Sequence, residues 1–88
     1  MKVVILYHSQ SDQERPVLDY ERDYEAVTGR KLTLCDVDTV EGAAMATLYD
    51  IVSYPAVLAM TNDGSLLQMW QGEVLPMINE VNYYDQPE

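Results

Sequence analysis

The chain has 88 residues, of which 48% are hydrophobic, and a net charge of −10 from 15 acidic and five basic side chains. This length is that of one domain, and we expect residues 1–84 to form it and residues 85–88 to be a short frayed tail. The acidity argues against nucleic acid and anionic membranes as partners, because few cations are present to contact phosphates. No apolar run approaches the roughly 20 residues of a membrane helix. The apolar segment after Met1 is too short for a signal peptide, so we expect a cytoplasmic protein.

The first elements predicted along the chain are a strand and a helix. Residues 2–7 are a continuous β-branched and aliphatic run, which is typical of a strand buried on both faces. From Gln13 onward, apolar residues recur at helical spacing. Ser11 or Asp12 is the expected N-cap of this helix, and Gly29 is suited to its C-terminal end.

The remaining elements are expected in the order strand, helix, strand, strand, helix, over residues 31–37, 41–50, 56–60, 66–70 and 76–84. The first two strands should be parallel, because a crossover helix joins them. The last two should form an antiparallel hairpin, because the short connection between them contains Gly64, which is suited to a left-handed turn position. The sequence therefore predicts the order β-α-β-α-β-β-α.

The junction Tyr54-Pro55 lies directly before the third predicted strand. It is a candidate cis peptide bond, because only an X–Pro bond brings the trans preference near ~1 kcal/mol. Together with Val37-Asp38, Asn62-Asp63-Gly64 and Gly72 before the last helix, this order resembles the thioredoxin/glutaredoxin fold over essentially the whole chain. The resemblance implies an α/β fold: a four-stranded mixed sheet of order 2-1-3-4 with helices on both faces.

The catalytic residues of that family are missing. The resemblance places the family's CxxC motif on residues 12–15, which are Asp-Gln-Glu-Arg, and its buried carboxylate on Leu6. Dithiol–disulfide exchange is therefore impossible at this position. We predict a redox-inactive protein with no catalytic residue, no cofactor and no metal, in which Asp12 favours the helix dipole.

Cys35 is the only cysteine, so the chain has neither an intramolecular disulfide nor a CxxC zinc site. It lies inside the second predicted strand, and free cysteines are among the most buried residues. An inert core thiol is the preferred interpretation. The alternative is a monothiol or glutathione-linked redox protein that uses Cys35.

Other polar residues near the strand ends lack a catalytic pattern. His8 follows the first strand and is expected to approach the Tyr54-Pro55 loop, but no nucleophile stands at a motif spacing from it. Asp36, Asp38 and Glu41 form an acidic cluster without the alternating loop of a calcium site. We do not predict a metal there.

In redox members of the family, the residue before the cis-proline offers its N–H and C=O to an extended peptide, and this interaction needs no sulfur. The resemblance therefore implies a candidate peptide-binding groove. Its residues would be Ser53, Tyr54, Pro55, Gln10, Ser11, Asp12 and Gly72. The alternative is that the proline serves the fold alone.

The sheet order also leaves the second and fourth strands as unpaired edges, which recruit other strands. Trp70 on the fourth strand either anchors such an edge interface or lies under a helix. The predicted function is non-catalytic binding of a protein or peptide, or self-association. The expected state is a monomer or an edge-mediated homodimer.

Overall fold

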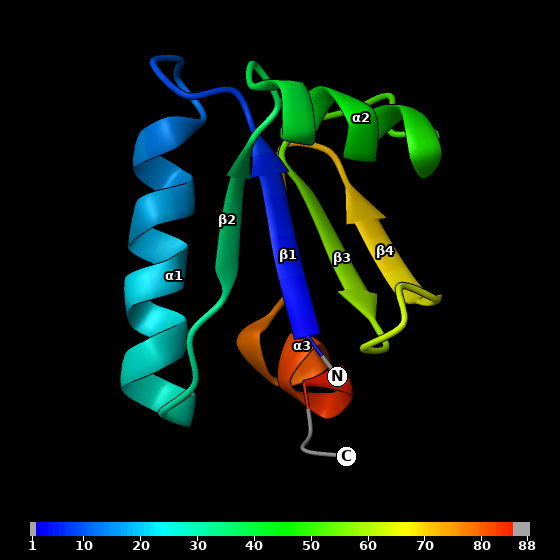
Figure 1. The fold of residues 1–88 in the computed structure, drawn as a ribbon. Helices are drawn as coiled ribbons and strands as arrows, with labels where there is room; N and C mark the ends of the chain where they lie inside the picture. The colour runs from blue at the N-terminus through cyan, green and yellow to red at the C-terminus, as the bar shows by residue number, and fades with distance from the viewer. Residues whose placement is uncertain (1, 86–88) are drawn as a thin grey trace.

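Four strands form one mixed sheet in the computed structural model, which describes residues 2–85 (Figure 1). The strands are β1 (Lys2–Tyr7), β2 (Thr33–Asp36), β3 (Ala56–Met60) and β4 (Leu66–Gln71), and the helices are α1 (Glu14–Thr28), α2 (Val40–Leu48) and α3 (Ile78–Tyr84). The sheet order is β2-β1-β3-β4, with β1 parallel to β2 and antiparallel to β3, and with β3 antiparallel to β4. The predicted fold class and strand order are confirmed.

The helices cover both faces of the sheet, with α1 and α3 on one face and α2 on the other. β1 divides its side chains between the two cores because alternate residues of a strand point to opposite faces. Val3 and Ile5 pack with α1 and α3, and Val4 and Leu6 pack on the α2 side. The prediction of a strand buried on both faces is therefore confirmed. Within residues 2–85, no helix combines the length and the apolar character needed to cross a bilayer.

Several elements are shorter than predicted. β2 begins at Thr33 and ends at Asp36, although the residues on either side of it are buried. α2 ends at Leu48 rather than at Asp50, which has a φ of 55° in the left-handed region that ends helices. α3 begins after Met77, an extended N-cap with ψ 146°. Met77 itself is 66% exposed.

Gly42 fixes how closely α2 approaches the end of β2. A Cβ atom at this position would lie 2.0 Å from the Asp36 carbonyl oxygen, so only glycine allows this approach. The Gly42 N–H donates to Oγ1 of Thr39, the N-cap of α2, at 3.1 Å. The start of α2 is therefore held against the loop that follows β2.

Asp85, the C-cap of α3, is docked rather than frayed. Asp85 is only 3% exposed and accepts a hydrogen bond from the Tyr24 hydroxyl at 2.8 Å. The guanidinium of Arg30 lies 3.2 Å from both of its carboxylate oxygens. The prediction of a frayed tail is wrong for Asp85, because two partners distant in sequence hold its carboxylate; residues 86–88 lie outside the described part of the chain.

Candidate functional site

The loop from β1 to α1 stands where the CxxC motif was expected. α1 begins at Glu14, and its N-cap is Gln13, which makes no side-chain capping bond. Ser11 orders the loop instead, because its Oγ donates to the His8 carbonyl at 2.5 Å and accepts from the Gln13 N–H at 3.2 Å. The prediction that Ser11 or Asp12 is the N-cap is wrong: the helix starts later, and the Asp12 carboxylate has no capping role.

The Tyr54-Pro55 peptide bond is cis, and Pro55 is buried at the start of β3. The Tyr54 carbonyl accepts only a long hydrogen bond of 3.4 Å from Nε2 of Gln13. Within residues 2–85, the Tyr54 N–H has no acceptor. The Pro55 carbonyl, by contrast, accepts from the Gly72 N–H at 3.2 Å. The main-chain N–H and C=O of Tyr54 thus have weaker hydrogen bonding than the Pro55 carbonyl.

A hollow of about 240 Å³ lies beside Pro55, and we call it the proline hollow. Its lining residues are Asp12, Gln13, Pro16, Pro55 and Glu73. Three of these were not predicted from the sequence: Gln13, Pro16 and Glu73. The helical spacing from Asp12 to Pro16 was the available signal for one wall, whereas nothing local marked Glu73.

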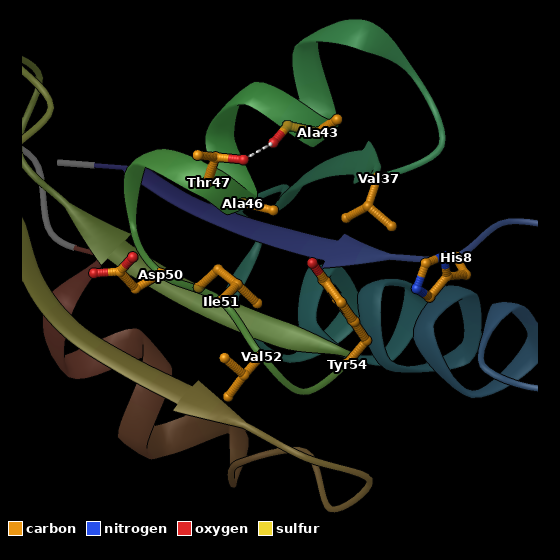
Figure 2. Close-up of a pocket in the computed structure, with 9 residues that line it drawn as sticks. All are labelled: His8, Val37, Ala43, Ala46, Thr47, Asp50, Ile51, Val52 and Tyr54. Atoms are coloured by element: carbon orange, nitrogen blue, oxygen red, sulfur yellow. Dashed lines mark hydrogen bonds between the residues drawn. The ribbon is translucent and has the colours of Figure 1, made fainter.

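A second hollow, of about 410 Å³, lies against α2. We call it the α2 hollow; its lining residues are His8, Val37, Ala43, Ala46, Thr47, Asp50, Ile51, Val52 and Tyr54. Figure 2 shows small side chains of α2 along one side and His8 and Tyr54 together at one end. The Thr47 hydroxyl is satisfied by the Ala43 carbonyl at 3.1 Å. Most of the walls are therefore apolar.

The predicted groove residues are brought only partly together. Asp12 and Pro55 line the proline hollow, Tyr54 lines the α2 hollow, and Gly72 is bonded to Pro55. The others line neither hollow. Gln10 donates its N–H to Glu14 at 3.0 Å, Ser11 orders the loop, and Ser53 donates its N–H to Oε1 of Gln71 at 3.1 Å.

His8 lies next to Tyr54, as predicted, with the two rings edge to face and their centroids 4.7 Å apart. Its Nδ1 is 3.2 Å from Oδ1 of Asp38. These contacts fix the ring at the end of the α2 hollow.

Asp36 organises the same end of the sheet. It accepts hydrogen bonds from the Ser9 hydroxyl, the Ser9 N–H at 3.3 Å and the Asp38 N–H at 2.9 Å. These bonds, the Ser9 hydroxyl first, lower the pKa of the Asp36 carboxyl. Within the described part of the chain, no group of three or more His, Cys, Asp and Glu side chains could hold a metal ion.

Cys35 is half-buried in β2, where its register partner is Leu6 of β1. Burial raises the pKa of its thiol, and the carboxylates of Glu41 and Asp36 raise it further. A reactive cysteine needs the opposite environment, in which a nearby cation or helix N-terminus favours the thiolate. The surroundings of Cys35 therefore disfavour the nucleophilic form.

Trp70 of β4 contacts the helix α3. It packs partly buried against the α1 and α3 core, with its ring edge to face against Tyr84 at 5.8 Å. The large apolar side chains of β4 that are open to solvent are Leu66 and Leu67, which are 39% and 43% exposed. Trp70 therefore anchors α3 to the sheet.

Comparison with known proteins identifies the fold but neither a family nor a function. No protein-family model matches the sequence, and no curated protein matches it. Among solved structures, thioredoxin 1 from the thermophilic eubacterium Thermosipho africanus TCF52B is similar, with a TM-score of 0.63 and 13% identity, over 97% of this chain and 90% of that chain. At this identity the similarity concerns the fold alone. The chain therefore has a thioredoxin-like fold, and with one cysteine it has no CxxC motif.

Proposed function

We propose that this chain is a non-catalytic thioredoxin-fold protein, acting in the cytoplasm, that binds an extended peptide segment across Tyr54-Pro55. The observation that supports the proposal is the state of the Tyr54 main chain. Its N–H lacks an acceptor within residues 2–85, and its carbonyl has only the 3.4 Å bond from Gln13. Main-chain groups of this kind pair with an added strand, which gives affinity without catalysis.

The two hollows provide places for side chains of such a peptide. Successive side chains of an extended segment point to opposite sides, and the two residues of the Tyr54-Pro55 junction line different hollows, Tyr54 the α2 hollow and Pro55 the proline hollow. The proline hollow, at about 240 Å³, is smaller than the ~300–1,000 Å³ typical of small-molecule sites. This size suits one side chain better than a whole small ligand.

Selection from a displayed library of random heptapeptides tests the proposal. We expect sequences enriched on the wild-type protein to lose binding to Pro16→Trp, which would fill the proline hollow from an exposed position on α1. Val27→Trp is the matched control, because Val27 is on the same helix, 71% exposed and lines neither hollow. Either no enrichment on the wild type or equal retention by both variants would overturn the proposal.

Self-association is a second candidate, and the edge strand β4 favours it. The strand Leu66–Gln71 contains no charged residue, and its two leucines are exposed at an unpaired edge. The net charge of −10 on each copy opposes this contact. If copies pair through β4, sedimentation velocity should show a dimer whose fraction rises with salt and which Leu67→Lys abolishes. A monomer at all concentrations and salt levels would exclude it.

The redox alternative depends on Cys35 and is tested separately. A monothiol or glutathione-linked activity should be present in the wild type and lost in Cys35→Ser. The raised pKa of the Cys35 thiol argues against that outcome. We therefore expect no turnover of a glutathione mixed disulfide by either protein.

A further inference from the structure

We infer that the proline hollow selects a cationic side chain, lysine or arginine, in the bound peptide. The inference rests on the proposed function and specifies its ligand. It comes from the side chains that line the hollow together with Pro55, and from the charge of the chain around them.

Two exposed acidic residues from distant segments line this hollow. Asp12 comes from the β1–α1 loop, and Glu73 comes from the segment after β4. Within residues 2–85, neither side chain makes a hydrogen bond or an ion pair, and Asp12 does not cap α1. The nearest cation in sequence, Arg15, is 3.6 Å from Asp19. The two negative charges are therefore not compensated within the described chain.

The rest of the hollow suits the stem of a long basic side chain. The rings of Pro16 and Pro55 supply apolar walls, and lysine and arginine bury their methylene stems along such surfaces while the charged head stays near water. The amide of Gln13 is already bonded to the His8 N–H at 3.1 Å and to the Tyr54 carbonyl at 3.4 Å. Apolar walls with two free carboxylates complement a cationic side chain and repel an acidic one.

The overall negative charge of the chain also favours a basic peptide. A net charge of −10 attracts basic segments over distances comparable to the Debye length. The local carboxylates then fix where the cation is held. A second acidic copy of this chain is disfavoured as the occupant by the same charge.

A panel of three synthetic heptapeptides tests the inference. The first is the most enriched sequence from the library, the second replaces its lysine or arginine with norleucine, and the third replaces it with glutamate. Exposed ion pairs each contribute ~0.2–1 kcal/mol, so two carboxylates predict that norleucine weakens binding roughly 2- to 30-fold. The difference should shrink as salt rises from about 0.02 M to about 0.5 M.

A matched pair of double variants separates local charge from net charge. Asp12→Asn with Glu73→Gln should remove the preference for the cationic peptide over the norleucine peptide. Asp23→Asn with Glu80→Gln changes the net charge equally, and neither residue lines the proline hollow. This control should keep the preference.

The outcomes distinguish the two proposals. If no heptapeptide is enriched, peptide binding itself fails. If enriched peptides bind at Tyr54-Pro55 without a cationic residue, or if both double variants lose the preference equally, this inference fails while peptide binding stands.

Discussion

Replacing Tyr24 with phenylalanine tests how the end of α3 is held to the rest of the protein. The change removes one hydroxyl and keeps the ring, so no cavity forms in the core. It deletes the 2.8 Å hydrogen bond from the Tyr24 hydroxyl to the carboxylate of Asp85. Tyr24 is 0% exposed and Asp85 3% exposed, so water does not readily replace the lost donor.

The expected magnitude follows from the charge of the acceptor. Hydrogen bonds to charged groups contribute about 1.5–3 kcal/mol, and an acceptor left unsatisfied in the interior adds to the loss. The contacts of Arg30 at 3.2 Å remain and keep the carboxylate partly compensated. We therefore expect Tyr24→Phe to lower the free energy of unfolding by about 2 kcal/mol. For a domain of this size that corresponds to roughly 8–16 °C in Tm.

Urea unfolding followed by circular dichroism measures the effect, with Tyr83→Phe as the control. Tyr83 is 75% exposed and adjacent to the same helix end, so losing its hydroxyl should change stability by less than ~0.5 kcal/mol. Asp85→Asn in the Tyr24→Phe background should cost less than it does alone, because the two residues are in contact. A Tyr24→Phe protein as stable as Tyr83→Phe would refute the account of a docked C-terminal segment.

Three further outcomes follow from other sites. Gly42→Ala should lower the free energy of unfolding by about 3 kcal/mol or more, because its Cβ would lie 2.0 Å from the Asp36 carbonyl oxygen. Gly29→Ala, which has open space but a φ of 75°, should lower it by only about 1–2 kcal/mol. Equal losses of stability in urea titrations would contradict this. Cys35 should react more slowly with a disulfide reagent in the native than in the unfolded protein at pH 7, because burial and the carboxylates of Glu41 and Asp36 raise the pKa of its thiol. Native labelling with a midpoint below about 8.5 would contradict this. Burial and, to a smaller extent, the charge of Glu80 raise the pKa of Tyr20 to about 12. The folded state therefore keeps this proton to higher pH than the unfolded state, and the urea midpoint should fall as pH rises from about 10 towards 12. A constant midpoint would count against burial of this phenol.

The sequence predicted the parts of the fold that local pattern specifies. A continuous apolar run gave β1, the Asn-Asp-Gly connection gave the hairpin, and the order of elements gave the sheet topology. Asp85 was missed because a lone acidic residue near the chain end has the pattern of a solvated tail. Its partners Tyr24 and Arg30 are 61 and 55 residues away in sequence, and no periodicity connects them.

Three of the five residues that line the proline hollow were missed for a related reason. The family resemblance directed attention to the loop residues before α1 and to the residue before the proline. Asp12 and Pro55, which were predicted, line the hollow together with three residues that were not: Gln13 and Pro16 at the start of α1, and Glu73 after β4. A local pattern predicts which residues form strands and helices, whereas the wall of a groove depends on which elements become neighbours in three dimensions.

The family resemblance places Asp12 where redox thioredoxins have a cysteine, and the loop before α1 differs accordingly. A thiolate at a helix N-terminus is stabilised by the helix dipole. A carboxylate of Asp12 at the corresponding position was expected to interact with the same dipole by capping the helix. However, α1 starts at Glu14, and its N-cap makes no side-chain bond. Asp12 lines the proline hollow instead, and Glu73 adds a second negative charge there. Glutathione has two carboxylates and one ammonium group, so this hollow should repel it. A glutathione-linked role for Cys35 would therefore need another surface. We expect binding at Tyr54-Pro55 to depend on the charge of the peptide rather than on thiol chemistry.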